Sequence, residues 1–244
     1  MVLTDDGYII IDPGPGSIAA FNQLGLDPSK VMMVLVSHRH IDHYTDSEVY
    51  IEAMTDGGNK KVGVLGAGKS VLEHIGEEVP AISSYHRSLP SRVLVLTPHD
   101  QFEEHEISVR AIYARHYDPH TIGFRIASNE TTIAYLPDTE YTDDLIEGIK
   151  NAQLLILSVL RPGGEKFSSH LCIDEAVELA RKARPEKVLL THFGTKMIMA
   201  PPEREARKFE SVTGIETIAA RDSMILNLSG KASDKDKSGL DLYT

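Results

Sequence analysis

The segment Ser37-His38-Arg39-His40-Ile41-Asp42-His43 constrains this chain more than any other part of the sequence. It directly follows Val31–Val36, an apolar run that predicts a strand. Residues two apart on an extended segment point the same way, so His38 and His40 can share one metal ion. The chain must then turn, which offers Asp42 and His43 to a second ion. Imidazoles with a carboxylate suit zinc, although manganese and iron also accept such ligands.

Four other candidate ligands share one placement, because each closes a predicted strand. They are Asp12, His116, Asp138 and His192. Any one of them taken alone is typical of a turn or cap at the end of a strand. Together with the histidine-rich segment, they supply enough ligands for two metal ions, with a carboxylate able to bridge them.

Short apolar, β-branched runs bounded by Gly, Pro, Asp or Asn predict strands along most of the chain. The expected strands are Tyr8–Ile11, Val31–Val36, Val62–Leu65, Arg92–Leu96, Ile107–Tyr113, Thr121–Ile126, Thr131–Tyr135, Leu154–Val159, Lys187–Leu190 and Met224–Leu228. Helical periodicity predicts helices at Lys69–Ile75, Thr142–Lys150, Ile173–Ala183 and Pro202–Thr213. Asp5-Asp6-Gly7 and Ser128-Asn129-Glu130 are expected to form hairpin turns. Hairpins and crossovers mixed with helices predict a layered α/β architecture.

Composition excludes several classes of function. The chain has 244 residues, 41% of them hydrophobic, and its net charge of −11 argues against a broad basic surface for nucleic acid. No apolar run approaches the ~20 residues of a membrane span, and the N-terminus lacks the pattern of a secretory signal. The lone Cys172 excludes an internal disulfide framework, so we expect a cytoplasmic protein with no membrane partner. We expect one domain over residues 1–228 and a disordered tail over residues 229–244; a homodimer is left open.

These motifs, in this order, resemble the metallo-β-lactamase superfamily over roughly residues 2–228. The resemblance implies an α/β fold, the αβ/βα four-layer sandwich, with two divalent metal ions at one edge and a hydroxide that bridges them. The ligands that it implies are His38, His40 and His116 for one ion, Asp42, His43 and His192 for the other, and Asp138 between them. It also implies that Asp12 orients the ligand loop from outside the ligand shell, and that Asp42 can accept a proton.

One further segment indicates the branch of the superfamily. Ser168-Ser169-His170, followed by a helix, a strand and the final histidine, resembles ribonuclease Z and the cyclic phosphodiesterases of phosphonate metabolism. In those relatives this histidine donates a proton to the leaving oxygen, so His170 joins Asp42 as a candidate catalytic residue. The alternative is that His170 caps the helix expected near Ile173. His120 is expected outside the ligand shell or at the surface.

The sequence also departs from ribonuclease Z. Only a hairpin's length separates His116 from Asp138, which leaves no room for that family's tRNA-binding arm. The opening Gly-rich segment is absent, since the chain begins about ten residues before Asp12; either the first strands are missing or the chain starts late. We therefore expect a phosphodiester hydrolase that acts on a small anionic substrate, cyclic or nucleotide-like, or on short single-stranded nucleic acid such as RNA. The alternatives are an acyl hydrolase, such as a β-lactamase, lactonase or thioesterase, and a non-catalytic metal-binding protein.

Overall fold

The computed structural model describes residues 1–128 and 131–228 and contains two β-sheets. The first sheet has the strand order β1-β2-β3-β4-β5. Its strands are β1 (Val2–Leu3), β2 (Tyr8–Ile11), β3 (Val31–Val36), β4 (Val64–Gly68) and β5 (Arg92–Leu96). β1 and β2 form the predicted antiparallel hairpin around Asp5-Asp6-Gly7, while β2 to β5 run parallel to one another.

The second sheet has the order β13-β12-β10-β9-β8-β7-β6, and β11 pairs with β10 at its side. Its strands are β6 (Gln101–Glu104), β7 (Ile107–Tyr113), β8 (Ile122–Ala127), β9 (Thr132–Leu136), β10 (Leu154–Arg161), β11 (Leu171–Cys172), β12 (Lys187–Thr191) and β13 (Glu216–Ala219). Strands β6 to β9 are antiparallel neighbours, whereas β9, β10, β12 and β13 are parallel. The carboxyl ends of β7, β9, β10 and β12 therefore lie at the same edge.

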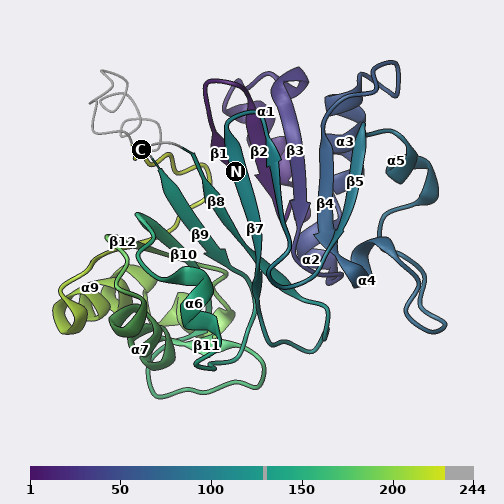
Figure 1. Cartoon of the computed structure of the whole chain (residues 1–244). Coiled ribbons are helices and arrows are strands. Elements are labelled where there is room, and N and C mark those ends of the chain that lie inside the picture. The colour runs from purple at the N-terminus through teal and green to yellow at the C-terminus, as the bar shows by residue number, and fades with distance from the viewer. Residues whose placement is uncertain (129–130, 229–244) are drawn as a thin grey trace.

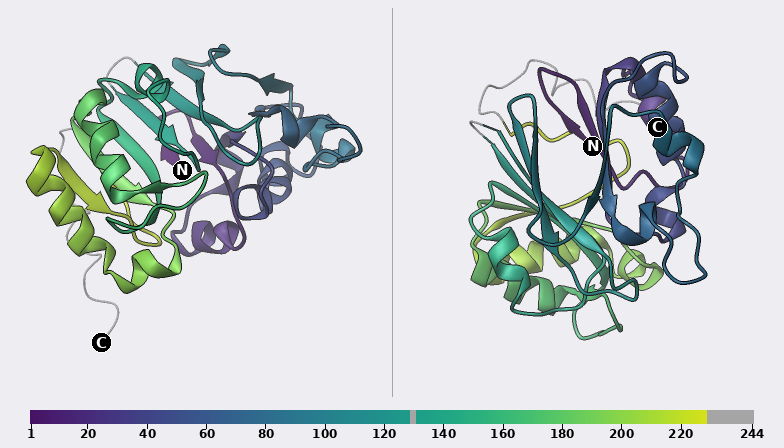
Figure 2. Two further views of the ribbon diagram at one scale, coloured as in Figure 1. Left: turned by 90° about the horizontal axis from the view of Figure 1, so that it is seen from below. Right: turned by 45° about the vertical axis from the view of Figure 1, so that its right-hand side comes forward.

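Helices cover the outer face of each sheet, as Figures 1 and 2 show. The first sheet is covered by α1 (Ser17–Gln23), the short α2 (Ile41–Tyr44), α3 (Ser47–Thr55), α4 (Lys69–Leu72) and α5 (Ser84–Ser88), with a 3₁₀ turn at Pro28–Lys30. The second is covered by α6 (Leu145–Ile149), α7 (Ile173–Ala183), α8 (Thr195–Met199) and α9 (Pro202–Thr213). Among the described residues, no helix is both long enough and apolar enough to cross a membrane.

Strand β3 shows how the layers are held together. Met33 and Leu35 pack between the two sheets, with Phe124 of β8 opposite, while Val34 and Val36 pack against the helices of the first sheet. A strand buried on both faces must be apolar throughout, which is why this run carries no alternation. A third apolar cluster lies between the second sheet and its helices. The expected α/β architecture, the αβ/βα four-layer sandwich, is confirmed.

Most of the predicted elements are present, with shifts at their ends. β2, β3, β5, β7, α7 and α9 have the predicted bounds. The prediction of a strand at Met224–Leu228 is wrong: the last strand is Glu216–Ala219, which occupies the open edge beside β12. Met224 and Ile225 are 43% and 63% exposed, so they lack the burial that would hold a strand against the core. The second predicted turn includes residues 129 and 130, and the predicted tail covers residues 229–244; both lie outside the described residues.

Candidate metal centre

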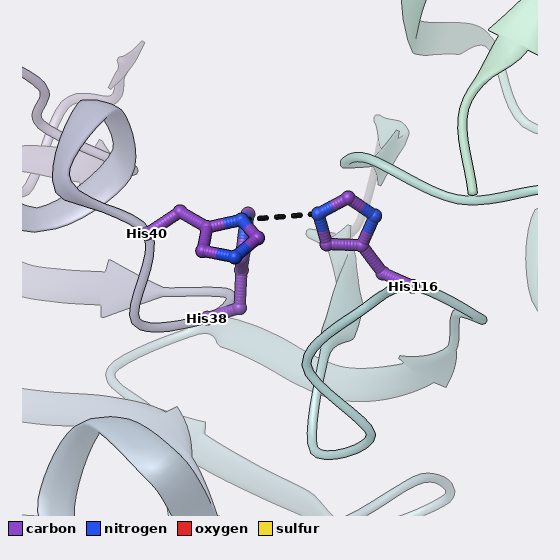
Figure 3. Close-up of side chains that lie close together, drawn as sticks. All are labelled: His38, His40 and His116. Atoms are coloured by element: carbon purple, nitrogen blue, oxygen red, sulfur yellow. Dashed lines mark hydrogen bonds between the residues drawn. The ribbon is translucent and has the colours of Figure 1, made fainter. Parts of the chain in front are cut away.

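The first cluster of candidate ligands consists of His38, His40 and His116 (Figure 3). His38 lies two residues after β3, His40 immediately precedes α2, and His116 lies three residues after β7. His38 Nε2 and His116 Nε2 each lie 3.0 Å from His40 Nδ1. Three ring nitrogens from two different sheets therefore face one point, and we refer to these residues as cluster one.

Hydrogen bonds outside cluster one determine which nitrogens carry protons. His116 Nδ1 lies 2.8 Å from the carbonyl oxygen of Ser169, so this nitrogen must donate. Ser37 donates its hydroxyl proton to Asp12, which leaves its oxygen to accept a proton from His38 Nδ1 at 2.9 Å. Both rings consequently direct an Nε2 lone pair inward. The three converging nitrogens therefore share at most one N–H, that of His40 Nδ1. Three nitrogens with so few protons between them form a better site for a cation than for hydrogen bonds.

Cluster two consists of Asp42, His43 and His192. His43 Nε2 lies 3.1 Å from His192 Nε2 and 3.6 Å from Asp42 Oδ2, and the latter two atoms are 3.3 Å apart. His43 donates from Nδ1 to Asp12 at 2.9 Å, so its Nε2 also faces inward. Although burial opposes it, hydrogen bonds and charge from Asp12 and Asp138 raise the pKa of His43 to about 10. The carboxylates that favour a second proton on this ring also favour a metal cation at its inward-facing Nε2.

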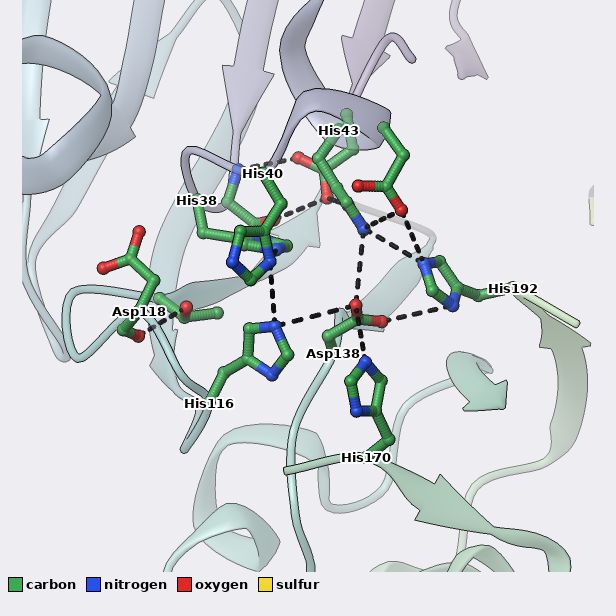
Figure 4. A network of polar contacts seen from close by, with 12 residues as sticks. His38, His40, His43, His116, Asp118, Asp138, His170 and His192 are labelled. Carbon is green, nitrogen blue, oxygen red and sulfur yellow. Dashed lines mark hydrogen bonds and ion pairs between the residues drawn. The ribbon is translucent and has the colours of Figure 1, made fainter. Parts of the chain in front are cut away.

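Asp138, which follows β9, lies between the two clusters (Figure 4). Its Oδ2 is 3.8 Å from His116 Nε2 of cluster one and 3.6 Å from His43 Nε2 of cluster two. Its Oδ1 faces His192 Nδ1 at 3.3 Å, yet neither of these buried atoms makes a hydrogen bond within the described part of the chain. A buried carboxylate whose oxygens lie between two sets of nitrogens matches the placement expected for a bridging ligand.

Asp12 lies behind the ligands and holds them. Its carboxylate accepts hydrogen bonds from Ser37, His43 and Tyr135, the last at 2.7 Å. Burial would raise the pKa of Asp12, but the hydrogen bond and charge of His43 lower it below its usual value. Burial, together with the charge of the same carboxylate, raises the pKa of Tyr135 well above 10, so the phenol remains a donor. Asp12 is therefore a fixed anion that orients His43.

Unusual backbone conformations and one close backbone contact also shape the site. Asp12, Ser169 and His192 have left-handed φ values of 46°, 57° and 61°, which residues other than glycine seldom adopt. Each of the three lies at a ligand or in direct contact with one, where such strain is characteristic of functional sites. Gly14 packs against the backbone of Asp42 so closely that a Cβ would collide with its carbonyl oxygen. This contact accounts for a glycine in the loop after β2.

His170 lies beside Asp138, in the loop before β11. Its Nε2 is 3.3 Å from Asp138 Oδ2, and its Nδ1 is 2.9 Å from the carbonyl oxygen of Ser168. Both nitrogens face oxygens, and although burial opposes it, Asp138 and Ser168 raise the pKa of His170 above its usual value. The alternative role as a helix cap is wrong, because Cys172 caps α7 through its contacts with Glu175. Ser169, which precedes His170, accepts the hydrogen bond from His116, so one segment fixes both rings.

His120 does not join either cluster. It lies in the loop between β7 and β8, where its backbone N–H donates to Asp118 at 2.9 Å. Sequence reasoning missed Asp118, which is buried and also accepts hydrogen bonds from the backbone of Arg39 and from Ser70. It therefore ties the histidine-rich loop to α4 and to the loop that carries His116. The one sign of Asp118 in the sequence was its position two residues after the candidate ligand His116.

Comparison with known proteins shows the family. Residues 8–193 match the family described as the beta-lactamase superfamily domain. The chain is 38% identical over 220 residues to the uncharacterized protein MJ1374 of Methanocaldococcus jannaschii, a match that covers 89% of this chain and 82% of that protein.

Solved structures show the same fold. The metallo-beta-lactamase fold protein YhfI from Bacillus subtilis is similar with a TM-score of 0.72 and 18% identity, over 91% of this chain and 87% of that one. A diphosphatase of the PhnP family gives 0.68 and 19%, over 91% and 79%. The short form of human tRNase Z gives 0.66 and 14%, over 93% and 90%. These likenesses show the fold, the family match confirms the predicted superfamily, and the chain belongs to the beta-lactamase superfamily.

Proposed function

We propose that this protein is a metal-dependent hydrolase that cleaves phosphodiesters. Cluster one would hold one divalent ion and cluster two a second, with Asp138 between them. Zinc fits these nitrogen and oxygen donors best, and manganese or iron would also fit. Two such ions would supply an activated water and neutralise negative charge that develops on the substrate.

The observation that carries this proposal is the position of His170. Its ring lies at the Asp138 side of the site, and the carbonyl oxygen of Ser168 holds Nδ1 so that Nε2 points to the reacting region. A protonated imidazole there can donate its Nε2 proton to a departing alkoxide. A phosphodiester has a poor leaving group and needs such a donor more than a strained lactam does. Asp42, whose side chain is 56% exposed, is the proposed acceptor for a proton from water.

The names of two structural neighbours agree with this choice of substrate. One is called a diphosphatase and the other a tRNase, and both act on phosphorus esters or anhydrides by those names. The net charge of −11 and the hairpin in place of an arm favour a small anionic substrate, or a short single strand, over a folded RNA.

A panel of substrates tests the reaction class. The metal-loaded protein is assayed with bis-p-nitrophenyl phosphate, nitrocefin and a homoserine lactone. We expect turnover of the diester only. Turnover of the lactam or lactone without the diester would make the protein an acyl hydrolase. Failure to retain zinc, manganese or iron after purification without chelator would contradict a metal-dependent activity altogether.

Replacement of His170 tests the proton donor. We expect His170→Ala to lower kcat for the diester by roughly 10²- to 10⁴-fold, because general acid catalysis is worth about that much. Metal content, measured by mass spectrometry of the purified protein, is expected to stay the same. The matched control is His74→Ala, at an exposed histidine of the same chain, which is expected to leave kcat unchanged. An unchanged kcat in His170→Ala would exclude the donor role.

A further inference from the structure

A hollow of about 370 Å³ opens beside cluster one. It is lined by the histidine-rich loop, α4 with the turn that follows it, and the loop after β7; the residues used below are Arg39, His40, Glu78, Tyr117, Asp118 and His120. Its volume falls in the range of small-molecule sites. Because it shares His40 with cluster one, a ligand in the hollow would also reach the proposed metal centre.

Tyr117 lines the hollow with an aromatic ring next to cluster one. Its ring centroid lies 5.4 Å from that of His116 and 6.2 Å from that of His170. The residue nevertheless remains 59% exposed. A large exposed aromatic ring beside both a candidate ligand and the proposed proton donor provides a face on which a planar group of the substrate can stack.

The charges in the hollow indicate what kind of group fits. Arg39 is ion-paired with Glu78, and Asp118 is occupied by hydrogen bonds from Ser70 and from two backbone N–H groups. No lining residue in the described part of the chain is an unpaired cation, so the hollow offers nothing to a second phosphate. The exposed carboxylate of Glu78 and the imidazole of His120 can still exchange hydrogen bonds with the edge of an uncharged ring.

We propose that the hollow binds a nucleobase, which stacks on Tyr117, and that the substrate is a small nucleotide phosphodiester. This inference rests on the proposed function, since it places the base next to a site for phosphodiester cleavage. A stacking face, edge-directed polar groups and the absence of an unpaired cation together fit a neutral heteroaromatic ring. The net charge of −11 favours a small nucleotide ester over a long strand as the occupant.

Calorimetric binding to the zinc-loaded protein tests the stacking. Adenosine monophosphate and ribose 5-phosphate carry the same phosphate and differ in the base. We expect the wild-type protein to bind the nucleotide about 10-fold more tightly, and Tyr117→Leu to remove most of that preference, because stacking of one base is worth about this factor. Tyr117→Phe is expected to keep the preference, since it retains the ring.

The matched control is Tyr85→Leu. Tyr85 is also an exposed tyrosine beside a histidine, but it lies on α5, away from the hollow. This variant is expected to bind both ligands like the wild type. Equal affinity of the wild type for the two ligands, or a preference unchanged in Tyr117→Leu, would overturn the nucleobase site.

The outcomes of these experiments distinguish failure of the proposed nucleobase site from failure of the proposed reaction. If no phosphodiester is hydrolysed but Tyr117 still confers the base preference, the proposed reaction fails and the nucleobase site stands. If diesters are cleaved but Tyr117→Leu keeps the base preference, the nucleobase site fails alone. A final comparison uses a dinucleotide and a decanucleotide of adenosine. Similar affinities support the small ester, whereas much tighter binding of the decanucleotide would overturn it in favour of a nucleic acid.

Discussion

At the scale of single residues, the site is determined by acceptors that lie outside it. The Nδ1–H groups of His116 and His38 donate hydrogen bonds to Ser169 and Ser37, and that of His43 donates to Asp12. Burial lowers the pKa of His38 to about 3, so this ring is neutral as a ligand must be. The outer partners therefore select the tautomers that direct lone pairs to a common point, before any ion binds.

Asp12 allows a direct test of this preorganisation. We expect Asp12→Asn to weaken zinc binding by about 10- to 100-fold, the usual effect of losing such an outer partner, because the acceptor charge for His43 is lost. The measurement is competition for zinc with a chelator of known affinity. Asp143→Asn, which removes the charge of an exposed aspartate on the surface, is the control and is expected to have no effect. Equal zinc affinity in Asp12→Asn and the wild type would show that Asp12 does not orient the ligands.

The site residues that could be predicted are those marked by a pattern of neighbouring residues in the sequence itself. His38, His40, Asp42 and His43 form one dense motif, and Asp12, His116, Asp138 and His192 follow strands, so their gathering could be inferred. Tyr135 could not be recognised, because a tyrosine inside a strand looks like any core residue. Only the pairing of β9 with its neighbours brings its hydroxyl to Asp12.

At the scale of elements, strands were easier to predict than the helices near the site. The helix α3 was missed because its buried side includes polar Ser47 and Thr55 beside Tyr50, Ile51 and Met54, which obscures the apolar period. Its position is set by packing against β3, a contact that no local pattern encodes. In α7, by contrast, all buried residues are aliphatic and recur at helical spacing, and its predicted bounds are confirmed.

Asp118 connects three elements, and its replacement should cost stability. We expect Asp118→Ala to lower the free energy of unfolding by about 3 kcal/mol at pH 7, because three donors, the buried hydroxyl of Ser70 and two half-buried backbone N–H groups, lose their acceptor. Although burial opposes it, the hydrogen bond from Ser70 and those from the backbone lower the pKa of Asp118. Its contribution is thus complete above the ordinary pKa of about 4 and is lost as the pH falls through the lowered value.

Urea denaturation of the metal-free protein measures this contribution. The difference between wild type and Asp118→Ala should be constant from pH 7 to about 4 and should shrink below that. Asp100→Ala is the control, because that exposed carboxylate also accepts two hydrogen bonds, both within its own turn. A cost for Asp118→Ala no larger than for Asp100→Ala would show that Asp118 does not connect the elements.

At the scale of the whole molecule, the two sheets contribute different halves of the site. The first sheet and its loops provide His38, His40, Asp42 and His43, and the second provides His116, Asp138, His170 and His192. Each cluster contains residues from both sheets. The centre thus adds charged and polar contacts between the two halves to the apolar layer that lies between the sheets.

Metal binding should therefore stabilise the whole molecule. A ligand that binds only the folded state at about 1,000 times its Kd adds about 4 kcal/mol, which for a chain of this size raises Tm by about 10 °C. We expect this rise between chelator-treated and zinc-loaded protein in differential scanning calorimetry. His192→Ala, which removes a ligand of cluster two, is expected to show a much smaller rise, whereas His105→Ala at an exposed turn should match the wild type. The same Tm with and without zinc in the wild type would mean that the clusters do not join the sheets through metal.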